Sequence, residues 1–510
     1  MITKEDFAYF HKIKKDAVLI QHQLISLKSK EVRFLVQKPA TLGNGIHEFP
    51  LDQQDHYRNY FDQHGSQISA IKFVPASGLA SRMFYFLRDF LLKFNPNEDN
   101  FETYLADESN HEFCYFIQHI EKFSFYDLIK NKVITEGQTH KNQAVFIYNF
   151  IQILLDDTAL GMEGRAKALL PLFSNSNSTS ESAFELQIIE ALQLFSNTLK
   201  TNVHFTIDAD QLPHFIALEN KLSEKISKGD SERLQIEYSF QDSKTDSIAL
   251  LDNRTILRDI DGKIEFSKSG HGALIGNIQR FKTDLVFIKT VDNIKPNDRR
   301  SVNVQKAMGG LYLERFNQIK SLLNQLQNTT ATSIDESTDF IKSYFHIDLT
   351  SKLKGLDFEK QIQRLIDFLN RPLRVCGMIT NEGKPGGGPF WIEHKGETAL
   401  QIVESSELQA SQGALPDALF FNPVNMVCGL KDFEDNTWEL DLYKDSGRSI
   451  ISEKIQMGQP IKTYELPGLW NGSMGYWNSI FVEIPKATFR SLKTINDFFR
   501  TKKRVILYFL

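Results

Sequence analysis

The sequence predicts an α/β fold in which a mixed, mostly parallel sheet is flanked by helices. Two observations lead to this prediction. Short apolar runs alternate with segments of helical spacing, as in the series 71–74, 203–207, 212–226, 235–240, 247–251 and 284–291. Alternation of this kind is typical of parallel α/β sheets, whose strands are buried on both faces. The run 284–291, rich in β-branched and aromatic residues, has the composition of a buried strand.

Composition and charge narrow the class of protein. The chain has 510 residues, enough for roughly two to four domains, and its 41% hydrophobic and 24% charged residues are ordinary for a globular protein. A net charge of −5 is small for this length, so we expect neither a nucleic acid nor a membrane partner. Cys114, Cys376 and Cys428 are far apart, which argues against a disulfide framework or a cysteine zinc site. With no apolar run of about 18 residues and no signal-peptide pattern, the expected location is cytoplasmic.

The chain divides into three predicted parts. Residues 1–70 form a polar helical extension, and residues 71–370 form the α/β core, interrupted by a helical insertion at about 85–160. The core ends with helices over 301–327, 333–345 and 357–370. Residues 371–510 have an α+β texture, with strands expected over 373–379, 398–404, 418–421, 438–443 and 478–484, a helix over 491–500 and a terminal strand over 504–510. We expect this last part to complete the sheet and the substrate site.

The segment 73–84 joins a strand to a helix through a loop of small residues, Ser77 to Ser81, that contains Gly78. Free backbone N–H groups at the start of a helix attract anions, and Arg82 adds a guanidinium group to the same place. The loop therefore predicts a phosphate site, although it matches neither the Gly-x-Gly-x-x-Gly motif nor the phosphate loop ending in Gly-Lys-Ser/Thr. The alternative is an ordinary turn between a strand and a helix.

A second candidate is the turn formed by Gly270, His271 and Gly272. Glycines on both sides of the histidine let the backbone approach a flat ligand, on which the imidazole ring can stack or to which it can donate a hydrogen bond. The alternative is a glycine-rich turn with an incidental histidine.

A third candidate is Asp292, which follows the apolar run 284–291. In an open parallel sheet, ligands bind at the carboxyl ends of the strands. A carboxylate at that edge suits Mg²⁺, which proteins usually hold through one or two oxygens together with substrate phosphates. The alternative role for Asp292 is to cap the next helix or turn.

The order of these motifs resembles that of the UDP-sugar pyrophosphorylases and the wider sugar nucleotidyltransferase group. The motifs are Arg-Met at 82–83, Lys-Ala-Leu-Leu-Pro at 167–171, Ser-Gly-His-Gly-Ala-Leu at 269–274 and Phe-Ile-Lys-x-Val-Asp-Asn at 287–293. Over most of residues 70–500, including the glycine-rich segments 383–391 and 466–472, the chain is also similar to an uncharacterised bacterial family, the domain of unknown function 4301. The resemblance implies a nucleotide-diphospho-sugar transferase-like fold of the GT-A/Rossmann-like kind.

The resemblance also implies roles for single residues. It assigns them as follows: Arg82 and Lys167 as catalytic cations, Asp292 as the Mg²⁺ ligand, Ser77, Gly78, Ser81, Gly270, His271 and Gly272 as nucleotide-binding residues, and Glu404 and Asn422 as sugar-binding residues. The implied partners are a nucleoside triphosphate and a sugar phosphate. The implied reaction is attack of a sugar-1-phosphate oxygen on the α-phosphorus of the triphosphate, with release of pyrophosphate.

Two departures from the pyrophosphorylase pattern keep other functions open. About 85 residues separate the small-residue loop from Lys167, and the loop has one glycine where relatives usually have two or three. One alternative is a catalytically degenerate protein that binds nucleotides or nucleotide sugars. The other is a metal-dependent glycosyltransferase that uses Asp259 and Asp261 as an Asp-x-Asp motif, although Gly262 after them also fits a hairpin turn.

Overall fold

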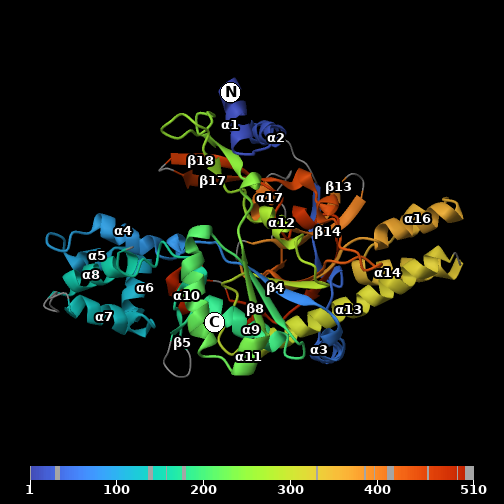
Figure 1. The fold of residues 1–510 in the computed structure, drawn as a ribbon, viewed down its shortest axis with the longest axis horizontal. Coiled ribbons are helices and arrows are strands. Elements are labelled where there is room, and N and C mark those ends of the chain that lie inside the picture. The colour runs from blue at the N-terminus through green and yellow to red at the C-terminus, as the bar shows by residue number, and fades with distance from the viewer. Residues whose placement is uncertain are drawn as a thin grey trace, which may run out of the picture.

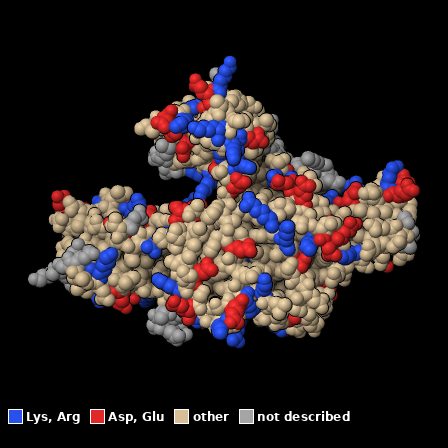
Figure 2. All heavy atoms as spheres, in the orientation of Figure 1, with Lys and Arg blue, Asp and Glu red and all other residues tan. Residues whose placement is uncertain are grey.

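The computed structural model describes residues 2–28, 35–135, 142–156, 158–174, 180–328, 331–383, 386–394, 397–409, 418–456, 459–490 and 492–499. Within these ranges, the prediction of a mixed, largely parallel α/β fold is confirmed (Figure 1). None of the helices described has the length and apolar composition needed to cross a membrane. Acidic and basic side chains are interspersed over the face shown in Figure 2, in keeping with the small net charge.

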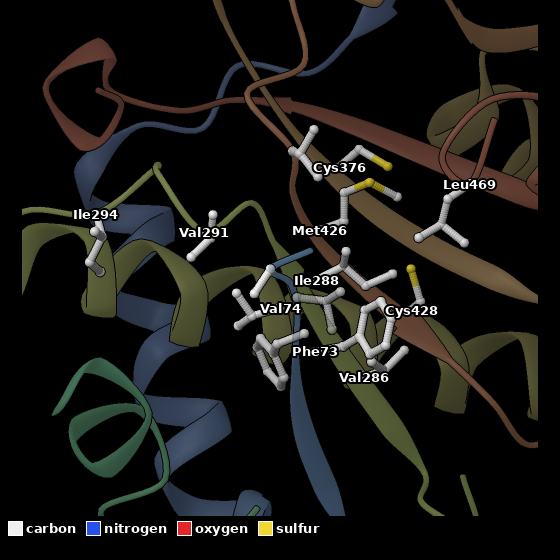
Figure 3. Packing of buried hydrophobic residues seen from close by; sticks show 14 of the residues in the cluster. Phe73, Val74, Val286, Ile288, Val291, Ile294, Cys376, Met426, Cys428 and Leu469 are labelled. Atoms are coloured by element: carbon white, nitrogen blue, oxygen red, sulfur yellow. The ribbon is translucent and has the colours of Figure 1, made fainter. Parts of the chain in front are cut away.

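An eight-stranded sheet forms the centre of the molecule. Its strands are β4 (Ala70–Pro75), β7 (Thr201–Thr206), β8 (Leu234–Ser239), β11 (Leu285–Lys289), β12 (Leu373–Thr380), β15 (Phe420–Phe421), β16 (Asn425–Gly429) and β19 (Asn478–Glu483). The order is β15-β12-β16-β11-β4-β7-β8, and β19 also pairs with β12. Strands from both sides of residue 370 therefore share one sheet, and their apolar side chains pack into one core (Figure 3).

The strand directions bring several loops together. β11, β4, β7 and β8 run parallel to one another, whereas β16 runs antiparallel to both β11 and β12. β11 and β12 therefore point the same way, and the carboxyl ends of β4, β7, β11 and β12 lie at one edge, which we call the C-terminal edge. The start of β16 lies there too, because Asn425 pairs with Lys289.

One face of the sheet is covered by three helices, α3 (Leu51–His64), α9 (Ala183–Leu194) and α13 (Arg299–Gln327). The long helix α13 packs along α3 and against β12 and β16. This close packing depends on Gly310, since a Cβ atom there would lie 1.9 Å from the carbonyl oxygen of Tyr57.

We expect Gly310→Ala to lower the free energy of unfolding by about 1–3 kcal/mol, because α3 would have to move away from α13. Urea denaturation measures this loss. Gly276→Ala, at a helical position where a Cβ atom would meet nothing within 4 Å, is the matched control and should not destabilise the protein. Equal stability of the two variants would contradict the close helix contact.

A buried ionic cluster links the sheet to this helical face. Glu190 on α9 pairs with Lys72 on β4 and with Lys289 on β11, each at 2.7 Å. Lys72 also donates to the carbonyl of Gln187 at 2.9 Å, and Lys289 to the hydroxyl of Ser301 at 2.8 Å. Gln187 in turn donates to the carbonyls of residues 290 and 291, so α9 fixes the loop that leaves β11.

The remaining elements lie around this core (Figure 1), some as separate lobes and others on the sheet itself, as where Phe215 packs against Phe205 and Tyr238. Their helices are α1 (Lys4–Lys12), α2 (Ala17–Lys28), α4 (Tyr85–Lys93), α5 (Phe101–Ala106), α6 (His111–His119), α7 (Tyr126–Thr135), α8 (Gln143–Leu155), α10 (Leu212–Ser223), α11 (Lys228–Arg233), α12 (Ile275–Ile278), α14 (Ala331–Phe345), α15 (Thr350–Leu353), α16 (Phe358–Leu369) and α17 (Ser405–Gln409). Their strands are β1 (Leu35–Pro39), β2 (Thr41–Leu42), β3 (Gly45–Ile46), β5 (Phe173–Ser174), β6 (Ser180–Glu181), β9 (Ser247–Leu251), β10 (Phe266–Ser267), β13 (Gly388–His394), β14 (Glu397–Val403), β17 (Ile450–Gln456) and β18 (Gln459–Glu465).

These lobes explain two parts of the sequence pattern. Helices α4 to α8 lie within residues 85–155, where a helical insertion was expected, and stacked phenylalanines such as Phe90 and Phe113 pack between them. Helices α1 and α2 cover a four-stranded sheet of order β10-β9-β18-β17. The run 247–251, expected within the α/β alternation, is thus β9 of this second sheet.

Two expected elements were wrong. Residues 438–443, expected as a strand, contain the 3₁₀ helix Leu440–Tyr443, because the Gln279 side chain bonds the carbonyl of Trp438 and the N–H of Leu440 and replaces a partner strand. Residues 491–500, expected as a helix, contain the 3₁₀ turn Ile495–Phe498. The expected terminal strand 504–510 lies outside the described residues.

Candidate functional site

A cavity of about 410 Å³ lies at the C-terminal edge of the sheet. Loops from both sides of residue 370 line it. The lining residues are Thr290, Asp292, Gly386, Gly387, Glu404, Ser405, Ser406, Phe421, Asn422, Pro423, Val424, Trp470, Phe489 and Arg490. Three of the predicted site residues, Asp292, Glu404 and Asn422, are therefore walls of one cavity.

Lys167 lies beside this cavity despite its distance in sequence from the small-residue loop. Its backbone N–H donates to the carbonyl of Gly78 at 3.0 Å, and the N–H of Ala80 donates to the carbonyl of Arg165 at 3.0 Å. The Lys167 ammonium group then lies 4.0 Å from a carboxylate oxygen of Asp292. The loop after β4, the lysine segment and the loop after β11 are thus side by side.

The rest of the predicted phosphate loop lies farther out. Ser81 and Arg82 are exposed, Ser77 is half-buried, and none of the three lines the cavity. Arg82 has no hydrogen bond or ion pair to any residue that the structure describes. Gly78 faces open space, since a Cβ atom there would meet nothing within 4 Å.

His271 and Glu404 contact each other directly. The imidazole Nε2 atom lies 3.2 Å from a Glu404 carboxylate oxygen, and Nδ1 accepts a hydrogen bond of 2.9 Å from the N–H of Leu469. Because Nδ1 is an acceptor, a neutral His271 carries its proton on Nε2, from which it donates a hydrogen bond to Glu404. The ring of Trp470 stacks on His271, with 4.0 Å between centroids and 12° between planes.

Trp470 completes this group by donating from Nε1 to the same Glu404 oxygen at 3.1 Å. Burial raises the pKa of Glu404, but the hydrogen bonds from His271, Asn471 and Trp470 outweigh it, so the pKa lies below its usual value. Glu404 is therefore a carboxylate at neutral pH, able to accept hydrogen bonds from a hydroxylated ligand in the cavity.

The glycines around His271 serve the chain's own packing. Gly270 has a φ of 75°, and a Cβ atom there would lie 2.4 Å from a carboxylate oxygen of Glu465. A Cβ atom at Gly272 would lie 2.2 Å from the carbonyl oxygen of Pro467. The expectation that these glycines make room for a flat ligand does not describe this structure, because the segment around Pro467 occupies that space.

Asn422 lies in a constrained loop between β15 and β16. Its N–H donates to the carbonyl of Gly387 at 2.8 Å, and its side-chain oxygen accepts from the N–H of Val424. Val424 has a φ of 54°, which is strained for a β-branched residue. The Asn422 amide nitrogen is buried and has no partner among the described residues.

A second layer of residues, not predicted from the sequence as functional, supports Glu404. The N–H of Glu404 donates to Glu407 at 2.8 Å, and Glu407 also accepts from Asn471 at 2.8 Å and from Arg448 at 2.9 Å. Glu407 and Arg448 are both buried. The sequence signal that could have revealed Glu407 is a second glutamate three residues after Glu404.

Asp292 is the residue that fits a divalent ion. Its carboxylate is about one-third exposed at the cavity, with the ammonium group of Lys167 as its ion-pair partner among the described residues. Mg²⁺ usually takes one or two carboxylates and fills its other positions with water and phosphate oxygens, so a single aspartate is sufficient. No group of three or more His, Cys, Asp or Glu side chains in the described ranges is placed to hold a metal by itself.

The Asp-x-Asp alternative falls at a hairpin. Asp259 accepts hydrogen bonds from the N–H groups of residues 261 and 263, and Gly262 has a φ of 78° in the same turn. Arg258 and Ile264 pair across it. The two aspartates do not line the cavity at the C-terminal edge.

Comparisons with known proteins give a family and a set of similar folds. A family model described as a domain of unknown function (DUF4301) matches residues 3–504. No curated protein sequence matches the chain. One similar solved structure is the uridine diphosphate N-acetylglucosamine pyrophosphorylase of Trypanosoma brucei, with a TM-score of 0.45 and 8% identity; the match covers 94% of this chain and 74% of that one. Another is a UDP-glucose pyrophosphorylase of Leishmania major, with a TM-score of 0.42 and 12% identity; the match covers 96% of this chain and 76% of that one.

Proposed function

We propose that this chain, which belongs to the DUF4301 family, transfers a nucleotidyl group from a nucleoside triphosphate to a sugar-1-phosphate or a similar phosphate. The observation that carries the proposal is the meeting of Lys167 and Asp292 beside the pair His271–Glu404, all at the C-terminal edge of the sheet. These residues come from four separate segments, and their motifs follow the order found in sugar nucleotidyltransferases.

The reaction needs positioning and charge neutralisation more than a protein nucleophile. An oxygen of the acceptor phosphate forms a bond with the α-phosphorus, the bond from that phosphorus to the bridging oxygen breaks, and pyrophosphate leaves with the electron pair. The ammonium group of Lys167 would lower the energy of the charge that spreads over the phosphate oxygens. Its weak pairing with Asp292, at 4.0 Å, leaves it able to reach a phosphate.

Asp292 would hold Mg²⁺ together with the phosphates of the substrate. When bound, such an ion neutralises phosphate charge and acts as a Lewis acid. Glu404 would accept hydrogen bonds from sugar hydroxyls, and Trp470 would form an apolar wall for the sugar ring beside it.

Pyrophosphate exchange tests the proposal. The purified protein, with Mg²⁺ and a panel of nucleotide sugars, should incorporate labelled pyrophosphate into a nucleoside triphosphate. A thermal-shift screen of the same ligands identifies the base and the sugar, since a ligand at 100 times its dissociation constant stabilises a protein by about 2.7 kcal/mol. The absence of exchange with every nucleotide sugar that binds would overturn the proposed activity.

The second candidate function is binding of a nucleotide or nucleotide sugar without turnover. The position of Arg82 and Ser81 favours it, since both lie away from the cavity that holds Asp292 and Glu404. Tight binding in the thermal-shift screen, combined with no pyrophosphate exchange, is the result that this function predicts.

The role of Glu404 gives a separate prediction. Glu404→Gln keeps an oxygen for His271 and Trp470 but replaces the negative charge that would receive sugar hydroxyls. We expect the KM for the sugar phosphate to rise about 10- to 100-fold, the effect of losing a hydrogen bond to a charged group, with little change in the KM for the triphosphate. Steady-state kinetics with each substrate varied in turn measures the difference, and an equal rise in both KM values would contradict the assignment.

A further inference from the structure

We infer that Arg490 binds a phosphate group of the ligand in the cavity. Arg490 lies in the C-terminal segment, outside every motif discussed above, and its side chain lines the cavity together with Asp292 and Asn422. The inference rests on the proposed function for the identity of the phosphate compound, and on the structure for the choice of residue.

Most donors of the Arg490 guanidinium group have no protein partner among the described residues. Among the described residues, no carboxylate lies within ion-pair distance of Arg490, and its guanidinium group makes one hydrogen bond, from Nη2 to the carbonyl of Phe498 at 3.0 Å. The charge of Asp497 acts on Arg490, but its carboxylate accepts hydrogen bonds from the N–H groups of Lys493 and Thr494 and makes no ion pair with the guanidinium group. A guanidinium group has five donors, so most of those of Arg490 remain available to a ligand.

Arg490 lies near other cations of the protein. Lys167 lies next to Asp292, and the ammonium group of Lys295 is held by the carbonyl of Ala487. Burial lowers the pKa of Lys295, the charge of Asp298 raises it, and the charges of Arg490, Lys289 and Arg300 lower it further, so three other cations act on this ammonium group. Asp292 and Glu404 also line the cavity, so the positive charge is local to the side of Arg490, where it favours an anionic group of the ligand.

Aromatic rings and a buried asparagine hold Arg490 in place. Its guanidinium carbon lies 4.6 Å from the ring centroid of Phe498 and 5.8 Å from that of Phe173. Its N–H donates to the side-chain oxygen of Asn293 at 3.3 Å, and Asn293 donates to the carbonyl of Pro423 at 3.1 Å. The buried Asn293 therefore ties the Asp292 loop, the Asn422 loop and the Arg490 segment together.

The chemistry of the guanidinium group suits an oxyanion, and the proposed function makes that oxyanion a phosphate. A guanidinium fork matches two oxygens of a phosphate with two parallel hydrogen bonds. A rigid fork also loses less conformational entropy on binding than a free side chain. Arg490 thus supplies, from the C-terminal segment, a cation comparable to the one sought in Arg82.

Calorimetric titration of the full-length protein with inorganic pyrophosphate, with and without Mg²⁺, tests this assignment. We expect Arg490→Gln to weaken binding about 10- to 100-fold, and Arg490→Lys, which keeps the charge but loses the fork, to weaken it less. Arg280→Gln, at an exposed position outside the cavity, is the matched control and should bind like the wild type. Melting curves of all variants separate loss of binding from loss of fold.

The outcomes distinguish this inference from the proposed function. Pyrophosphate binding that depends on Arg490, in a protein that performs no exchange, supports the phosphate role and rejects the transferase. If Arg490→Gln retains exchange activity with unchanged KM values for both phosphorylated substrates, the phosphate role of Arg490 is rejected and the proposed transferase activity stands. Equal pyrophosphate affinity of Arg490→Gln, Arg490→Lys and the wild type would also overturn the inference.

Discussion

Asp292→Ala should abolish pyrophosphate exchange while leaving the melting temperature nearly unchanged. A metal held by this carboxylate would contribute several kcal/mol of charge stabilisation in the transition state, and about 1.4 kcal/mol corresponds to a tenfold change in rate. We therefore expect kcat to fall at least about 100- to 1,000-fold. The stability should change little, because the carboxylate is about one-third exposed and its ion pair with Lys167 is long, at 4.0 Å. Such exposed pairs contribute about 0–1 kcal/mol.

Asp284→Ala is the matched control for this experiment. Asp284 immediately precedes the same strand, β11, and its side chain is as exposed as that of Asp292, at 33% against 32%. It accepts hydrogen bonds from the N–H and hydroxyl of Ser69 at 2.7 and 2.9 Å. Its loss should lower the stability and preserve the exchange activity, the reverse of the expected result for Asp292→Ala. Full activity of Asp292→Ala would remove the aspartate from the mechanism.

The position of Asp292 could be predicted because it depends on a general rule. Strands that alternate with helices run parallel, so the residue after an apolar strand lies at the ligand-binding edge. The contact between His271 and Glu404 could not be predicted, because it requires β14 and the segment around Pro467 to meet at the turn after β10. Lys167 was found by its motif, but the bond between its N–H and Gly78 that closes the long insertion leaves no pattern in the sequence.

Two of the strands that were not predicted, β17 and β18, share a physical cause. β17 and β18 form a hairpin of mixed polarity, in which Glu453 pairs with Lys462 and Ser452 with Thr463. Such strands are stabilised by cross-strand pairs and lack the apolar run that identifies a buried strand. The buried cluster of Lys72, Glu190 and Lys289 was missed for the opposite reason, since each charged residue is surrounded in sequence by apolar ones. A lysine in each of two neighbouring apolar strands is the signal that could have revealed it.

Glu190→Gln should lower the free energy of unfolding by about 3–5 kcal/mol, the cost of removing one partner from a buried ion pair. Glu190 is 4% exposed, and its two oxygens separately accept from Lys72 and Lys289 at 2.7 Å. Glutamine fills the same space, but its amide offers one acceptor oxygen and no charge to two buried ammonium groups. Urea denaturation at pH 7 measures the loss.

The acid side of this effect follows from the pKa of Glu190. Burial raises the pKa, but the charges of Lys289 and Lys72 outweigh it and hold the pKa at about 2, below the ordinary value of 4.5. A lowered pKa in the folded state stabilises the protein above the pKa of the unfolded chain, and the contribution is lost as the pH falls through the folded pKa. Wild-type stability should therefore decline between about pH 4.5 and pH 2, and Glu190→Gln should lack this part of the decline.

The effect of Glu190 on stability at alkaline pH depends on Lys72. Burial lowers the pKa of Lys72 to about 8, although the charge of Glu190 raises it. Between about pH 8 and pH 10.5 the unfolded chain binds more protons than the folded one, so this lysine makes the stability rise with pH. Without Glu190 the pKa of Lys72 falls further, so the rise in stability begins at a lower pH. The difference in stability between Glu190→Gln and the wild type should therefore narrow from pH 7 to pH 10.

Glu185→Gln separates this charge effect from packing. Glu185 lies on the same helix and is similarly buried, at 3% exposure, but it caps the helix by accepting from the N–H of Ser182 at 2.8 Å. Its ion pair, with Lys225 at 2.9 Å, involves an exposed ammonium group, and such pairs contribute about 0–1 kcal/mol. Glutamine can replace glutamate in such a cap, so the stability should change by less than about 1 kcal/mol. A difference between Glu190→Gln and the wild type that stays constant from pH 7 to pH 10 would mean that Lys72 keeps its proton without a counter-charge. The loss of stability would then arise from the shape of the side chain, and the ionic explanation would fail.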